Sequence, residues 1–227
     1  MQYVQSMHVH DNNSLVTAMG ESIVGRYLLK LQWCHVERCP RLQAVSTCGQ
    51  HFPSLRTLSA CDLSMAYCIF AGRFSWFRAL HHIYLHNCPR LVFVAIHIIP
   101  CLATLQIAYC SNLQHVFPSD DRHSEERASG VTFNKLKHIK LFHLHRLEQI
   151  CEVRLTAPAL ETISLRDCWG LRRLPAVGSK LPMVDCEKDW WERLEWDGLE
   201  ANHDPSLFQT RHSAYHKKTL SRVSVLR

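Results

Sequence analysis

The sequence predicts an α/β solenoid, in which about seven short repeats stack into a curved parallel β-sheet with an irregular or short helical convex side. The template L-x-x-L-x-L-x-x-C-x-x-L-x-x-V recurs along the chain at a spacing of about 25 residues. Apolar residues or cysteine fill all but one of the forty-two template positions in seven copies. Polar and apolar residues alternate in the middle of each copy, which is the pattern of a strand buried on one face.

Each copy is expected to contribute one strand and one return path. Template positions 4 and 6 point inward from the strand, and positions 12 and 15 supply the apolar return. Position 9 lies where the chain leaves the strand, so a cysteine or asparagine there is expected to bond to nearby backbone. No copy can bury its apolar face alone, and stacking of neighbours gives one continuous core. The copies begin at Val4, Leu31, Leu55, Leu80, Leu102, Leu136 and Leu160.

The repeat pattern predicts two regions. Residues 1–178 form the solenoid, with the polar insertion 118–132 as an exposed loop. Residues 179–227 form a C-terminal cap and a basic tail, because a terminal repeat must cover its open apolar end. The side chains expected to provide this cover are Trp190, Trp191, Leu194 and Trp196.

Composition and charge exclude several classes of protein. The hydrophobic content of 47% and charged content of 20% are those of a globular protein. The net charge of +6 is concentrated in residues 201–227, which leaves the solenoid close to neutral and argues against nucleic-acid binding by it. The apolar run 93–105 is too short to span a bilayer. Eleven cysteines without an export signal predict reduced thiols and a cytoplasmic location.

The stretch LHHIYLHNCPRL (80–91) has the spacing of a candidate metal site. His82 and His86 occupy positions 3 and 7, which face away from the core, whereas Cys88 occupies position 9 and faces inward. Ligands on opposite faces cannot share an ion, so no metal and no cofactor are expected. Nor do the residues form a Ser-His-Asp or paired-carboxylate pattern, and the chain is not expected to be an enzyme.

Positions 3, 5 and 7 point outward and together tile the concave face of the predicted sheet. Aromatic residues and arginine on such a face are the usual anchors of protein interfaces. The alternative is that exposed strand positions favour aromatic residues through β-propensity alone. The candidate protein-binding residues are His8, Trp33, His35, His82, Tyr84, His86, His138, Lys140, Phe142 and Arg166.

Two repeats and the C-terminal segment carry a family resemblance. The stretches LKLQWCHVERCPRLQAV (29–45) and LHHIYLHNCPRLVFV (80–94) resemble the leucine-rich repeats of plant nucleotide-binding disease resistance proteins. The segment 184–227 is similar to the C-terminus of grass members of the coiled-coil class. The resemblance implies recognition of a pathogen effector or guarded host protein, and autoinhibition by packing against a nucleotide-binding module. No G-x-x-x-x-G-K-[ST] phosphate loop is present, so the chain resembles a C-terminal piece or a truncated homologue.

Two other functions remain open at this point. A generic leucine-rich repeat scaffold or adaptor would show the same template and the same exposed strands. A metal- or nucleic-acid-binding protein is less favoured, because the basic tail offers only the short run Lys217-Lys218 with one nearby tyrosine.

Overall fold

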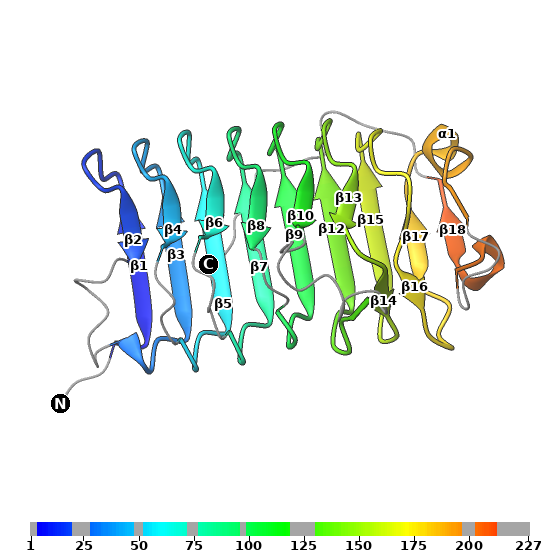
Figure 1. Ribbon diagram of the computed structural model, residues 1–227, viewed down its shortest axis with the longest axis horizontal. Helices are drawn as coiled ribbons and strands as arrows, with labels where there is room; N and C mark the ends of the chain where they lie inside the picture. The colour runs from blue at the N-terminus through cyan, green and yellow to red at the C-terminus, as the bar shows by residue number, and fades with distance from the viewer. Residues whose placement is uncertain are drawn as a thin grey trace.

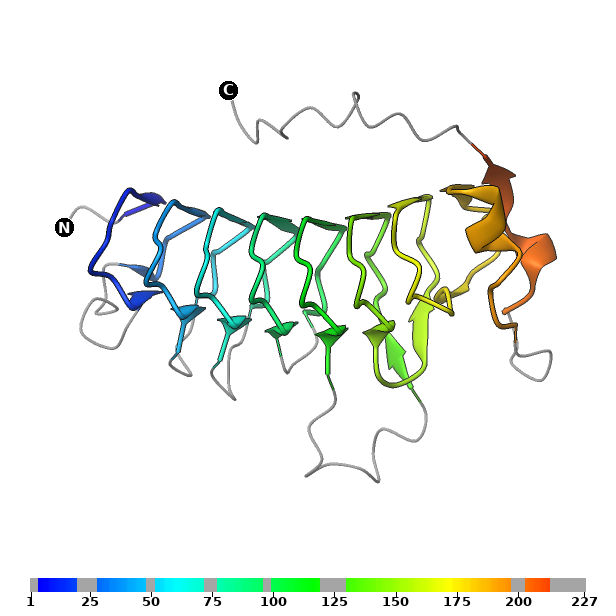
Figure 2. The same ribbon diagram turned by 90° about the horizontal axis from the view of Figure 1, so that it is seen from above.

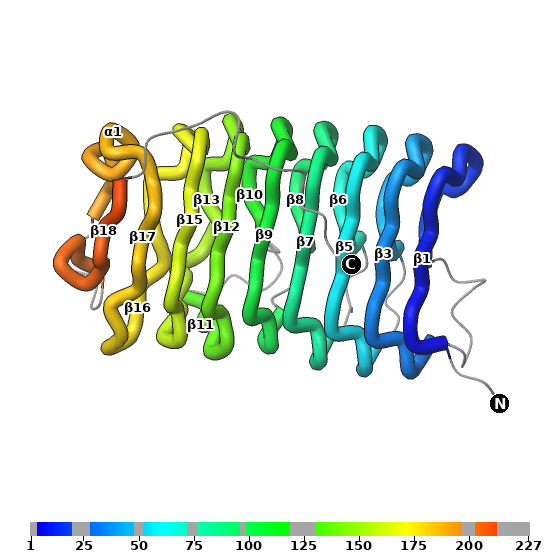
Figure 3. The backbone as a smooth tube through the Cα atoms, turned by 180° about the vertical axis from the view of Figure 1, so that it is seen from behind, coloured from blue at the N-terminus to red at the C-terminus, as the bar shows by residue number. Residues whose placement is uncertain are grey.

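In the computed structural model, seven turns of chain wind into a solenoid whose strands stand side by side in chain order (Figures 1 and 3). The structure describes residues 4–19, 28–47, 52–71, 77–95, 99–118, 130–196 and 203–212. One large sheet forms the concave side of the solenoid, as Figure 2 shows. Its strands, in spatial order, are β1 (Ser6–His10), β3 (Trp33–Glu37), β5 (Thr57–Cys61), β7 (His82–His86), β9 (Thr104–Ala108), β12 (His138–Phe142), β15 (Thr162–Arg166), β17 (Met183–Asp185) and β18 (Gln209–Arg211).

The template and the strands coincide. In each of the seven copies, positions 3 to 7 form the strand of the large sheet, and all neighbouring strands are parallel. Equal template positions pair across the sheet, so that His82 stands between Thr57 and Thr104. The predicted parallel solenoid of seven repeats is confirmed.

The convex side carries short strands in place of the irregular or short helical segments expected from the sequence. Position 15 of several copies lies within them, for example Val45, Ile69 and Val94. β-branched and aromatic residues favour such extended segments. These strands form three small sheets: β2 (Thr17–Met19), β4 (Ala44–Ser46), β6 (Cys68–Phe70) and β8 (Phe93–Ala95); β10 (His115–Phe117) and β13 (Gln149–Cys151); and β11 (Val131–Thr132), β14 (Leu155–Ala157) and β16 (Ala176–Val177).

One apolar core runs through the stack. All six template positions in each copy from Leu31 to Leu174 are at most 5% exposed. The first copy is more open, since Val4 is 38% exposed and both Met7 and Val9 are only partly buried. Burial of the template residues therefore requires a neighbouring copy on each side, as expected for a stacked repeat.

In each of the seven copies, the residue at position 8 has a left-handed backbone conformation and directly follows the strand of the large sheet. In the first six copies its N–H donates to the position-7 carbonyl of the next copy, as Asn87 does to Ala108 at 2.9 Å. In the last copy the Asp167 N–H donates instead to the Glu187 carboxylate at 2.9 Å. The position-9 thiols of Cys39, Cys110 and Cys168 then donate to the position-7 carbonyl of their own copy at 3.3–3.5 Å. The predicted bonding of position 9 to backbone is confirmed. The left-handed residues are Asp11, Arg38, Asp62, Asn87, Tyr109, His143 and Asp167.

The C-terminal end of the core is covered by α1 (Lys188–Trp191), the 3-10 helix η3 (Pro205–Leu207) and strand β18. Trp190 is the buried residue of α1, and its indole N–H lies 3.0 and 3.1 Å from the carbonyl oxygens of Cys168 and Leu171. Trp191 and Trp196 pack edge to face beside Phe208. Strand β18 is an addition at this end that the sequence pattern did not predict.

Two predicted segments lie largely or wholly outside the described residues. The polar insertion is described only at 118 and at 130–132, and the tail containing Lys217 and Lys218 is outside the described ranges. Within the described residues, no helix has the length and apolar character needed to cross a membrane.

Candidate protein-binding face

All ten candidate binding residues lie on the concave sheet, at outward positions 3, 5 or 7. They come from five strands, and the strict parallel register aligns the three positions into columns that cross the solenoid. The ten residues therefore lie on one face, and their role in protein binding stays a prediction. The strands that carry them are β1, β3, β7, β12 and β15.

Large and small side chains alternate along these columns. At position 3, Trp33, His82 and His138 are separated by Thr57 and Thr104. At position 5, Ser59 and Gln106 are buried between larger neighbours. Strands β3, β7 and β12 therefore form raised rows on the face, and β5 and β9 form low rows between them. The aligned copies carry this alternation in the sequence, but no single residue of the predicted face indicates it.

An aromatic cluster occupies the N-terminal part of the face. The rings of Trp33 and His35 stack at 5.8 Å with an interplanar angle of 12°, and the His8 ring lies 4.7 Å from that of His35. Both imidazoles approach Glu37 at 3.5 Å. Burial lowers the pKa of His35 and so favours the neutral form of its ring.

The middle row presents a second aromatic pair. His82 and Tyr84 stack at 6.2 Å with an interplanar angle of 11°, and burial lowers the pKa of His82. Both side chains are half-buried. The indole N–H of Trp33 and one ring nitrogen of His82 have no hydrogen-bond partner among the described residues. Buried polar atoms of this kind are satisfied when a partner or water supplies the missing bond.

The C-terminal part of the face is more polar. Lys140 is exposed, and His138 contacts the Thr162 hydroxyl at 2.9 Å. Arg166 is largely covered, and its guanidinium forms an ion pair with Asp185 at 2.7 Å and donates to the Asp185 carbonyl at 2.8 Å. Arg166 therefore links β15 to β17, a role that the sequence did not indicate.

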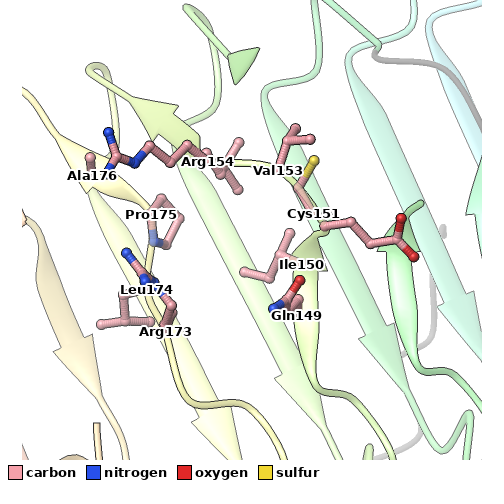
Figure 4. Close-up of a pocket in the computed structure, with 11 residues that line it drawn as sticks. Gln149, Ile150, Cys151, Val153, Arg154, Arg173, Leu174, Pro175 and Ala176 are labelled. Atoms are coloured by element: carbon pink, nitrogen blue, oxygen red, sulfur yellow. The ribbon is translucent and has the colours of Figure 1, made fainter. Parts of the chain in front are cut away.

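A small hollow lies on the opposite, convex side. It measures about 200 Å³ and is lined by residues 149–155 and 173–176 (Figure 4). Ligand pockets are typically about 300–1,000 Å³ and largely apolar. Arg154 and Arg173 lie beside this hollow, so it is both small and charged, and the broad concave face is the better candidate for binding.

The comparison with protein-family models gives one match that covers most of the solenoid. Residues 56–179 match the family described as plant disease resistance protein RPS2-like, leucine-rich repeats. The chain belongs to this family. The matched residues include β5 to β16, and thus two of the raised rows and both low rows of the concave face.

Curated plant disease resistance proteins are similar to part of this chain. The disease resistance protein RPS5 of Arabidopsis thaliana is 31% identical over 104 residues, which are 43% of this chain and 12% of that protein. The disease resistance protein SUMM2 of the same plant is 35% identical over 74 residues, 30% of this chain and 8% of that protein. The chain thus spans about a tenth of the length of these relatives. No solved structure matches it.

Proposed function

We propose that this chain is a non-catalytic protein-recognition and autoinhibition module of plant innate immunity that acts in the cytoplasm. Its concave face binds a pathogen effector or a guarded host protein. The same solenoid packs against the nucleotide-binding module of an immune receptor and holds that module inactive. Membership in the plant disease resistance repeat family supports the role in immunity.

One observation carries the binding role. Seven strands in strict register present raised rows rich in aromatic side chains, with low rows between them. Stacked aromatic residues supply rigid apolar area at little entropic cost, and interface energy is concentrated in such anchors. Trp33, Tyr84 and the exposed Lys140 are spread over three raised rows, so a partner that contacts all three covers most of the sheet.

The test is a binding measurement between the purified chain and the nucleotide-binding module of a receptor of this family. Wild-type chain is expected to bind. Trp33→Ala, Tyr84→Ala and Lys140→Glu are each expected to cost about 2 kcal/mol, which is roughly a 30-fold weaker affinity. A partner secreted by a pathogen is tested with the same three variants.

Two substitutions matched by residue type serve as controls. Trp169→Ala removes an indole that is 39% exposed in the turn after β15, and Lys135→Glu reverses a charge that lies outside the strand columns. Both are expected to bind as the wild type does. Equal affinities for face and control variants, or no binding by the wild type, would contradict the proposal.

A further inference from the structure

Stacking of the repeats brings Cys61, Asp62 and His86 together at one edge of the concave face. Within a single repeat, His86 and Cys88 point to opposite sides of the chain, which is why no metal is expected from that pair. In the structure the thiol beside His86 belongs to the preceding repeat. Cys61 and His86 are paired residues at the ends of β5 and β7, and Asp62 is the left-handed residue that follows Cys61.

The three ligand atoms converge. The Cys61 Sγ atom lies 3.6 Å from Asp62 Oδ2 and 3.9 Å from His86 Nδ1. One ligand atom from each of the three residues lies within 4.8 Å of the other two. Thiolate, imidazole and carboxylate ligands at the usual bond lengths of about 2.0–2.3 Å from a tetrahedral Zn²⁺ ion stand roughly 3.3–3.6 Å apart. The observed separations are within a few tenths of an ångström of that arrangement for both sulfur contacts. As thiol hydrogen bonds they are long and weak.

Neighbouring groups hold two of these ligands in place. The Asn87 amide donates to Asp62 Oδ1 at 2.6 Å, which leaves Oδ2 directed at the thiol. The Tyr109 ring packs edge-on against the His86 ring at 5.2 Å. Hydrogen bonds and packing behind the ligands orient them, and this outer support is typical of zinc sites.

Two similar clusters on the described surface are better explained without an ion. In the group His8, His35 and Glu37, the carboxylate also pairs with the Arg38 guanidinium at 3.0 Å, and this positive charge opposes a bound cation. In the group His143, His145 and Asp167, His143 Nδ1 lies 2.9 Å from the carboxylate, an ordinary hydrogen bond.

We propose that Cys61 Sγ, Asp62 Oδ2 and His86 Nδ1 bind one Zn²⁺ ion, with a fourth position open to solvent. The ion joins two adjacent repeats, β5 and β7, at the edge of the proposed binding face. Binding displaces the thiol proton into solvent, because the thiolate is the ligand.

Burial, with further contributions from Asp62, Cys88 and Glu37, raises the pKa of the Cys61 thiol to about 12. The free thiol is therefore protonated at neutral pH and is not an activated nucleophile, in spite of the adjacent imidazole.

The test uses metal-free chain, kept reduced with a non-thiol reductant and titrated with Co²⁺ as a spectroscopic probe and Zn²⁺ as its competitor. The wild type is expected to bind one equivalent with a thiolate-to-cobalt charge-transfer band in the near ultraviolet. Cys61→Ala is expected to abolish this band, and His86→Ala to prevent stoichiometric binding. Asn87→Gly keeps the left-handed turn but removes the supporting amide, and is expected to weaken Zn²⁺ binding roughly 10-fold.

Controls separate this site from adventitious thiol binding and from misfolding. Cys101→Ala removes another half-buried thiol, and His82→Ala removes another imidazole of the same strand. Both variants should bind Co²⁺ and Zn²⁺ as the wild type does. The circular dichroism spectra of all variants in the metal-free state should be the same. The proposal is overturned if the wild type binds no stoichiometric metal, if the band survives in Cys61→Ala, or if Cys101→Ala loses it equally.

Discussion

Cysteine has different roles in this chain that depend on its template position. At position 9, Cys168 is buried and donates to the carbonyl of Arg166, so that it closes the turn. At position 7, Cys61 lies on the outward face beside an imidazole. The template separates these roles in the sequence, because positions 7 and 9 differ in the side to which they point.

Buried thiols are expected to resist alkylation in the folded protein. Burial raises the pKa of the Cys34 and Cys168 thiols to about 12, so at pH 8 both are protonated and inaccessible. Iodoacetamide at pH 8 should spare them and modify the half-buried Cys101 and Cys151, whereas all four should react in urea. Peptide mass spectrometry measures the modification, and alkylation of Cys168 as fast as Cys101 in native protein would contradict this burial.

Residue type alone predicts the left-handed conformation at some of the turn positions and not at others. Asp11, Asp62, Asn87 and Asp167 are residue types that tolerate this conformation, but Arg38 and Tyr109 are not. Their conformation is imposed by the backbone hydrogen bond from each turn to the next copy, such as that of Tyr109 to Phe142 at 3.0 Å. Sequence alone would not assign these two positions.

At the scale of elements, the strands of the concave sheet were predictable, whereas the convex strands were not and the end of the solenoid was predictable only in part. Period-2 alternation marked the concave strand of each copy, while the aromatic run after residue 188 indicated a cover without its geometry. The structure adds β18 beside β17, and the cover is completed by Phe208 from that returning segment. The pairing of β17 with β18 depends on contacts across more than twenty residues, which local pattern does not encode.

Trp190 is expected to be the residue on which this cover depends most. Trp190→Ala should lower the free energy of unfolding by about 3–5 kcal/mol, because it empties a buried indole site. Trp190→Phe keeps most of the volume but leaves the carbonyls of Cys168 and Leu171 without their donor, and should cost about 1–3 kcal/mol.

Urea denaturation measures both changes. Trp169→Ala is the matched control, since that indole is 39% exposed and its loss should change stability by no more than about 0.5 kcal/mol. Equal effects of the substitutions at 169 and 190 would show that the indole of Trp190 does not hold the cover.

On the scale of the whole molecule, each repeat is stabilised by its neighbours, and stability should vary along the stack. The first copy is the most open, since Met7 and Val9 are only partly buried while Leu105 and Ile107 in β9 are fully buried. We expect amide hydrogens of β1 to exchange with deuterium faster than those of β9 in native protein. Mass spectrometry of peptides from both strands measures this, with the unfolded chain as reference, and equal protection would indicate a uniformly cooperative stack.

The sequence by itself determined the repeat, its register and which side chains face the core. These follow from a local pattern that recurs seven times along the chain. The sequence also placed all ten candidate face residues on one surface, because outward positions of a stacked strand share a face by symmetry.

Only the tertiary structure decided which side chains from different repeats meet. The sequence shows His86 near Cys88 of its own repeat, and the structure places it beside Cys61 of the preceding one. Arg166 was expected on the binding face, and the structure pairs it with Asp185. Such contacts join residues about 20 to 25 positions apart. They depend on the rotation between successive turns of the solenoid and on side-chain rotamers, and the sequence template determines neither.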